Sequence, residues 1–167
     1  MIRPSTIAVM TLFTAASLLP SIAGAEPAAH SHEHEAHEHE TFSAGEPGDP
    51  NELSRTIPII MEESDGKMLY VPDRIEINKD ETIKFVIQNH GELDHEFVLA
   101  SVEDNLKHAK AMEMNPEMEH DDPNAIRVAP KQTGEIIWKF NKAGQFEFAC
   151  LIPGHRDAGM LGIVEVK

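Results

Sequence analysis

Residues 144–163, GQFEFACLIPGHRDAGMLGI, contain two apolar runs separated by a short polar connection. In the first run the two phenylalanines alternate with other residues, which puts both of them and Cys150 on one face of a strand. Pro153 and Gly154 end that strand, because both residue types favour turns. The second run starts at Met160. This segment therefore predicts two strands joined by a loop, each with one face turned toward a core.

Runs of similar length continue upstream, and turn residues separate them. They cover residues 56–61, 74–78, 82–87, 95–100, 125–128 and 135–140, followed by 145–150 and 160–166 in the segment above. Many short strands at this spacing favour an all-β, antiparallel β-sandwich over an α/β fold. Residues 53–167 amount to about 115 positions, which is a normal size for one domain of this kind.

The first 25 residues are predicted to be a secretory signal peptide. Arg3 supplies a positive charge, residues 7–19 are apolar apart from threonine and serine, and Ala23 and Ala25 provide small residues for cleavage. The apolar run is short for a membrane span. We therefore expect export to the periplasm, cleavage after Ala25, and a mature chain that starts at Glu26 and has no membrane segment. An uncleaved N-terminal anchor is the alternative.

Residues 26–52 are expected to form a disordered arm, because they are polar, contain three prolines and lack apolar periodicity. The arm carries five histidines within ten residues, with glutamates between them: His30, His32, His34, His37 and His39. Much of the imidazole is uncharged near neutral pH and can bind Cu(II), Zn(II) or Ni(II). A solvated polar tail without a metal is the alternative.

A polar stretch at residues 102–124 interrupts the strands and is expected to be a long connection or flap. Residues 103–114 are predicted to form a short helix that Pro116 ends. The stretch contains a loose group of metal donors: His108, Met112, Met114, Met118 and His120. We expect exposed thioethers here, which would favour Cu(I) over zinc. Alternatively, the methionines belong to a helix that packs on the sandwich.

Cys150 is the single cysteine of the chain, so an exported protein could not use it for an internal disulfide. The loop after it can bring His155 and Met160 to the same point, which offers a thiolate, an imidazole and a thioether. A second histidine, His95, shares a strand face with Phe97 and is expected to point inward. Two imidazoles, a thiolate and a distant thioether are the donor set of a blue-copper site. Each residue alone could be ordinary core, but their combination favours a ligand set.

With these features, residues 53–167 resemble the cupredoxins, the small blue-copper family of plastocyanins, azurins and amicyanins. The likeness lies in Ile75-x-Ile77 followed by Ile83-x-Phe85, in the Gly144-Gln-Phe-Glu-Phe entry to the Cys strand, and in the Cys…His…Met loop. The resemblance implies a Greek-key β-sandwich with a Met/His-rich insertion. It also implies one type 1 copper ion held by His95, Cys150, His155 and axial Met160.

Two features differ from the common cupredoxin pattern. Glu96 stands where many members have an asparagine that hydrogen-bonds to the Cys loop, and four residues separate each successive pair of loop ligands. A further histidine, His90, lies in the turn that precedes His95. Outer hydrogen bonds and loop length tune the geometry and potential of copper. The resemblance therefore leaves a blue site and a distorted, greener site equally open.

The His-rich arm and the Met/His-rich insertion make the chain similar to CopI-type periplasmic copper-resistance cupredoxins. This resemblance implies copper tolerance through copper binding and oxidation of Cu(I). The insertion would capture Cu(I), the cupredoxin copper would accept its electron, and the arm would hold the resulting Cu(II). Two alternatives stay open: a one-electron carrier between periplasmic redox proteins, and a metal storage module in which the β-domain is only a scaffold.

Composition argues against several other classes of protein. The formal net charge is −15 at pH 7, which disfavours nucleic acid and anionic membranes as partners. No Ser/His/Asp triad, phosphate loop or paired-carboxylate site suggests hydrolysis or group transfer. We therefore expect a copper-binding or electron-transfer protein rather than an enzyme, with cuprous oxidation as the exception. The expected partners are copper ions and a periplasmic redox protein, and a monomer is the default.

Overall fold

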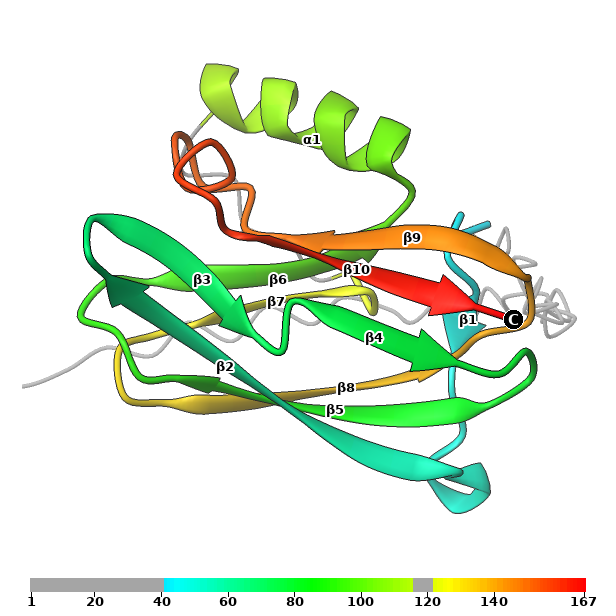
Figure 1. Ribbon diagram of the computed structural model, residues 1–167. Coiled ribbons are helices and arrows are strands. Elements are labelled where there is room, and N and C mark those ends of the chain that lie inside the picture. Colours follow the sequence, from blue (N-terminus) through cyan, green and yellow to red (C-terminus); the bar gives the residue numbers. More distant parts are fainter. Residues whose placement is uncertain (1–40, 116–121) are drawn as a thin grey trace, which may run out of the picture. The chain divides into compact units, whose positions relative to one another are not determined.

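Ten strands in two facing sheets form the framework of residues 41–115 and 122–167, the part of the chain that the computed structural model describes (Figure 1). The first sheet has the order β1 (Glu46–Pro47), β8 (Thr133–Lys139), β5 (Thr82–Asn89), β2 (Arg55–Ser64) and β3 (Lys67–Val71). The second has the order β4 (Arg74–Ile77), β10 (Leu161–Val166), β9 (Gly144–Ala149), β6 (His95–Ala100) and β7 (Ala125–Val128). A short 3-10 helix, η1 (Pro50–Glu52), and one α-helix, α1 (Val102–Met114), lie between strands.

The predicted all-β sandwich is confirmed, but its sheets are mixed rather than purely antiparallel. Most neighbouring strands pair antiparallel, whereas β2 pairs parallel with β5 and β4 pairs parallel with β10. Strands β10, β9 and β6 are the interior strands of the second sheet, so each is paired on both sides. The backbone on either side of the Cys–His–Met loop is therefore fixed by two sets of ladder hydrogen bonds.

Aromatic rings fill the space between the two sheets. Phe97 on β6 and Phe148 on β9 stack with their ring centroids 5.1 Å apart, and Tyr70 of β3 meets Phe148 edge-on at 5.1 Å. The Tyr70 hydroxyl, which is buried, donates a hydrogen bond to the backbone carbonyl of Glu96. Cys150 and Met160 belong to the same buried cluster, so the loop that they delimit rests directly on the core.

Helix α1 lies over the outer face of β6 and β9 (Figure 1) and confirms the helix predicted in the insertion. The Ser101 side chain caps its start by accepting a hydrogen bond from the backbone N–H of Asp104 at 3.1 Å. Because the core covers the inner face and α1 covers the outer one, every residue of β6 is buried. In the described ranges, no helix combines the length and apolar character that a membrane span requires.

The sandwich begins before residue 53, the boundary expected from the sequence. Phe42 packs edge-on against Trp138 with the ring centroids 5.3 Å apart, and Ala44 is fully buried. The Trp138 indole N–H donates to the Ala44 carbonyl at 3.1 Å, and β1 then pairs with β8. Two apolar side chains in a polar stretch give too short a pattern to predict this. Residues 41–52 are therefore part of the folded domain rather than of the arm.

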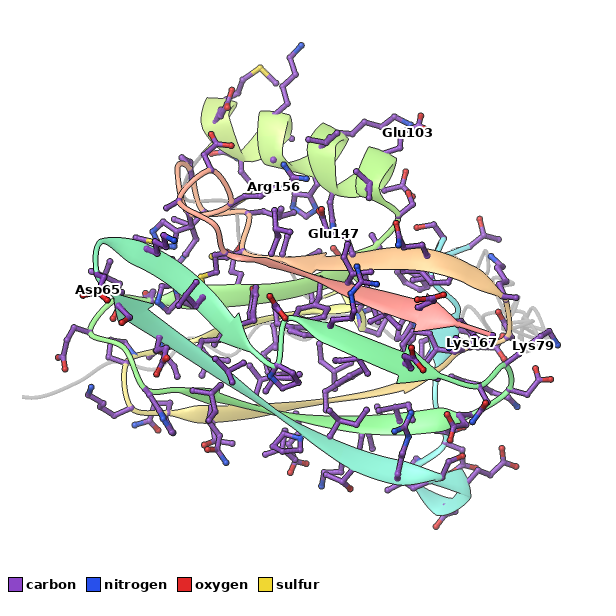
Figure 2. All side chains as sticks on the ribbon, in the orientation of Figure 1. Asp65, Lys79, Glu103, Glu147, Arg156 and Lys167 are labelled. Atoms are coloured by element: carbon purple, nitrogen blue, oxygen red, sulfur yellow. The ribbon has the colours of Figure 1, made fainter. Side chains whose placement is uncertain are left out.

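A buried ion pair ties the loop after Cys150 to β9 and to α1. Arg156 donates two hydrogen bonds to the carboxylate of Glu147, at 3.1 and 2.8 Å, and only 3% of the Glu147 side chain is exposed. The amide of Asn105 on α1 donates to the same carboxylate at 3.2 Å and to the Glu147 backbone carbonyl at 3.2 Å. Figure 2 places Arg156 and Glu147 beneath α1. One carboxylate therefore joins a strand, a helix and the loop.

Replacing Arg156 with alanine should lower the free energy of unfolding by about 3 kcal/mol, because it leaves the buried Glu147 carboxylate without its cation. Urea unfolding of the metal-free protein measures the change. The matched control is Arg74→Ala, which removes an arginine from an exposed pair with Glu165 and should cost less than about 1 kcal/mol. Equal losses in the two variants would contradict the proposed role of the buried pair.

Candidate metal centre

Donor atoms from three elements converge at one end of the second sheet. His95 is the first residue of β6, Cys150 directly follows β9, and His155 lies in the loop between β9 and β10. The His95 Nδ1 lies 3.3 Å from the His155 Nδ1, which in turn lies 3.3 Å from the Cys150 Sγ. All three donor atoms lie within 4.8 Å of one another, and among the described residues they are the group that could hold a metal ion.

Tight turns between β9 and β10 bring His155 back toward Cys150. The backbone N–H of His155 donates to the carbonyl of Ile152 at 3.0 Å, and that of Ala158 donates to Gly154 at 3.0 Å. Gly154 has a φ of +86°, a backbone region that residues with a Cβ rarely adopt. The Pro153–Gly154 turn predicted from the sequence is therefore the feature that reverses the chain.

Met160 is anchored to the other two loop residues by its backbone. Its N–H donates to the His155 carbonyl at 3.1 Å, and its carbonyl accepts from the Cys150 N–H at 3.1 Å. The Met160 side chain is fully buried in the core cluster that contains Cys150. This arrangement is compatible with the expected axial thioether, which stays a prediction.

Cys150 is fully buried, and burial raises the pKa of its thiol to about 12. The backbone N–H groups of Glu96 and Ile152 act in the opposite direction, and the Glu96 N–H lies 3.3 Å from the Cys150 Sγ. Glu96 occupies the position of the asparagine found in many cupredoxins, and here it is the backbone amide that contacts the sulfur. In the metal-free protein the thiol is therefore protonated at neutral pH, and a cation is needed to stabilise the thiolate.

The surroundings of the two imidazoles leave each with a nitrogen that could bind a metal ion. The His95 Nε2 lies 2.8 Å from a carboxylate oxygen of Glu63, which can only accept, so Nε2 carries the hydrogen and Nδ1 presents its lone pair. Burial lowers the pKa of His155, and the neighbouring His95 lowers it further. His155 is therefore neutral near pH 7, as a metal ligand must be.

Glu63 is the residue at this centre that sequence reasoning missed. It is the second of two adjacent glutamates near the end of β2, where acidic residues usually face solvent. Burial raises its pKa, but hydrogen bonds from the Glu92 amide, from His95 and from the Leu93 amide outweigh this and leave the pKa below its usual value. No sequence signal distinguishes Glu63 from the adjacent Glu62, which is also half-buried.

The donor set fits copper. Thiolate is a soft ligand that suits Cu(I), imidazole suits both Cu(I) and Cu(II), and two imidazoles with one thiolate are the equatorial ligands of blue-copper sites. A structural zinc site normally has four strong ligands, whereas this one offers three and a buried thioether nearby. The chemistry of the residues therefore agrees with the metal that the resemblance implied.

The other predicted donors do not gather in the described residues. Met112 is fully buried against Val98, Ala149 and Leu151, contrary to the expectation that the insertion methionines are exposed. Met114, two residues later, is 78% exposed, so the two thioethers lie in different environments.

His108 is half-buried on α1, and His90 is exposed and contacts Gln88 at 3.2 Å. The remaining predicted donors lie outside the described residues: Met118, His120, and the arm histidines His30, His32, His34, His37 and His39. The predicted signal peptide lies outside them as well.

Comparison with known proteins agrees with this geometry. The family model of copper-binding proteins of the plastocyanin/azurin family matches residues 58–167. The copper-resistant cuproprotein CopI of Rubrivivax gelatinosus is 42% identical over 99% of this chain and 97% of its own length. The protein of the same name from Pseudomonas aeruginosa is 34% identical over 74% of this chain and 82% of its own.

Among solved structures, the reduced auracyanin of Roseiflexus castenholzii superposes with a TM-score of 0.57 at 22% identity, covering 69% of this chain and 98% of its own. At that identity the likeness shows the fold alone. Together with the sequence matches and the converging donor atoms, it leads to one conclusion: the chain belongs to the plastocyanin/azurin family of copper-binding proteins, the cupredoxins.

Proposed function

We propose that this chain binds one type 1 copper ion through His95, Cys150, His155 and axial Met160, and that it acts in copper resistance by binding and oxidising Cu(I). The observation that carries the proposal is the convergence of two Nδ1 atoms and one Sγ within 4.8 Å in a largely buried site. Two relatives that align over most of the chain are both named copper-resistant cuproproteins, which supports the role in resistance.

The residues around the site hold its donors in place. Two backbone N–H groups point at the Cys150 sulfur, Glu63 fixes one imidazole, and the Arg156–Glu147 pair fixes the loop that carries the other. Bound copper would supply one-electron chemistry, taking an electron from a substrate Cu(I) ion and passing it to an oxidised periplasmic redox protein. The protein scaffold contributes ligands that need not move between the two oxidation states.

Capture of substrate Cu(I) is assigned to the insertion, and storage of the product Cu(II) to the arm. Met114 is the exposed thioether of α1, and Met118 and His120 follow it in the sequence. Met112 supports α1 from the core instead. The Cu(I) ion loses one electron, and the resulting Cu(II) suits the imidazoles of the arm better than thioethers. The match to the Rubrivivax gelatinosus relative spans 99% of this chain, so it includes the arm.

We further propose export to the periplasm, with cleavage of the signal peptide after Ala25, and a monomeric mature protein.

The second candidate function is a one-electron carrier. The half-buried His155 and the exposed Pro153 and Gly154 beside it favour it, because a redox partner could approach the copper through this loop. In a carrier, the arm and the insertion would not affect activity.

Titration of residues 26–167 with Cu(II) should produce an intense thiolate-to-copper absorption band that saturates at about one equivalent. The Cys150→Ser variant should lack this band, while weaker absorption from the arm histidines persists at higher loading. The measurement is the visible spectrum, with Arg74→Ala as a control that keeps the band. Absence of an intense band at every loading would favour the storage module.

Binding of Cu(II) near pH 7.5 should release about one proton from the protein, because the Cys150 thiol, with a pKa of about 12, must lose its proton to become a ligand. Since that pKa lies above the working range, the Cu(II) affinity of this site should rise about tenfold per pH unit between about pH 7 and 9. Calorimetry in buffers of different ionisation enthalpy counts the protons. Binding without proton release would exclude the thiolate as a ligand.

Removing residues 26–40 and replacing Met114, Met118 and His120 with alanine should reduce copper tolerance of a copper-sensitive host while the intense visible band is unchanged. The deletion ends before Phe42, whose ring packs against Trp138, so the fold should persist. Met112→Leu is the matched control, because this thioether is buried and a leucine of similar volume should leave tolerance intact. Unaltered tolerance in the first variant would support the electron carrier.

A further inference from the structure

The Glu63 carboxylate connects β2 to the first histidine of the centre. One of its oxygens, Oε1, lies 2.8 Å from the His95 Nε2 and accepts from the Leu93 N–H at 3.1 Å. The other, Oε2, accepts from the Glu92 N–H at 2.9 Å. His95 is fully buried and 26% of the Glu63 side chain is exposed, so the contact lies at the edge of the core. The same carboxylate therefore contacts the His95 imidazole and the backbone amides of Glu92 and Leu93 in the turn before it.

The turn between β5 and β6 is built around this carboxylate. A Cβ at Gly91 would lie 2.4 Å from the Glu63 Oε2 and 2.5 Å from Oε1, so a side chain there would collide with the carboxylate. The amide side chain of Asn89, which is fully buried, accepts from the Gly91 N–H at 2.9 Å and donates to the Leu93 carbonyl at 2.7 Å. Glycine at position 91 therefore leaves room for the Glu63 carboxylate behind His95, and Asn89 holds the turn around it.

We propose that Glu63 is a positioning residue of the copper centre, which orients His95, fixes its Nε2–H tautomer, and biases the site toward Cu(II). The inference rests on the proposed type 1 site and extends it to a residue outside the ligand set. Its basis is the geometry of the contact between the carboxylate and the imidazole.

Two physical effects act in the same direction. A carboxylate that accepts the Nε2–H makes the imidazole a more basic ligand at Nδ1, and a more basic nitrogen favours the more highly charged ion. The negative charge of Glu63, one imidazole away from the metal position, also stabilises Cu(II) more than Cu(I) by Coulomb attraction. The acidic residues that precede His95 offer no substitute, since Glu92 is 82% exposed and pairs with Lys131, and Asp94 pairs with Arg127.

The test is Glu63→Gln in the copper-loaded mature chain, residues 26–167. A glutamine keeps an oxygen that can accept from the His95 Nε2–H and removes the charge. The ratio of Cu(II) to Cu(I) affinity should fall about tenfold, which corresponds to a reduction potential about 59 mV higher for a one-electron couple. The intense visible band should remain. Glu62→Gln is the matched control, because it removes one charge from the same strand, and its potential should stay close to that of the wild type.

An unchanged potential in Glu63→Gln, or an equal rise in Glu62→Gln, would overturn the assignment. Glu63→Asp restores the charge and should return most of the wild-type potential, whereas a potential as high as that of Glu63→Gln would show that the charge does not set it and would also overturn the assignment. These outcomes require the visible band in the wild type. Its absence would count against the proposed type 1 site itself, so the two failures are distinguishable.

A measurement on the metal-free wild-type chain does not depend on how the variants fold. The ¹⁵N chemical shifts of the His95 ring should show a protonated Nε2 and an unprotonated Nδ1, with slow solvent exchange of the Nε2–H. The Nδ1–H tautomer, or a freely exchanging ring, would contradict the positioning role of Glu63.

Discussion

The convergence of three polar donor atoms in a largely buried place is the constraint on which the rest of the structure depends. Buried polar groups are unfavourable unless they find partners, and the partners of the His95 Nδ1, the His155 Nδ1 and the Cys150 Sγ are mainly one another and two backbone amides. A rigid surround must keep them together. The interior strands β6, β9 and β10 provide it, because each is hydrogen-bonded on both sides and Phe97 of β6 stacks on Phe148 of β9.

The insertion has a structural role as well as the proposed capture of Cu(I). Without α1, the outer face of β6 and β9 would expose Val98, Ala149 and the carboxylate of Glu147. The helix covers this face and contributes Met112 to it. The Asn105 side chain of the helix donates a hydrogen bond to the Glu147 carboxylate, which also accepts from Arg156. Arg156 directly follows His155 in the sequence. The position of His155, a proposed copper ligand, is therefore coupled to the packing of α1 on the sheet. Residues of the insertion can therefore influence the centre without touching it.

The parts of the structure that were predictable are those with a repeating pattern or a selective combination of residues. Alternation gave β6 and β7 at their observed bounds, and the spacing of Cys150, His155 and Met160 pointed to a shared site. Strand β3 was missed because Lys67–Val71 is short, and β1 because Glu46–Pro47 has no alternation. Met112 was expected at the surface because sequence shows residue type but not which face of a helix meets a sheet. The role of Glu63 could not be predicted for a related reason, since it contacts His95, which lies 32 positions later in the sequence.

The ligand set alone does not determine how strongly this centre would favour Cu(II). The Glu96 N–H at the Cys150 sulfur draws electron density from the thiolate and so favours Cu(I), whereas the Glu63 carboxylate strengthens the His95 nitrogen and favours Cu(II). One effect comes from a backbone amide that any residue at position 96 other than proline would provide. The other depends on a single side chain and on the glycine that makes room for it. Among related chains that share the four proposed ligands, the potential should therefore vary more with positions 63 and 91 than with position 96.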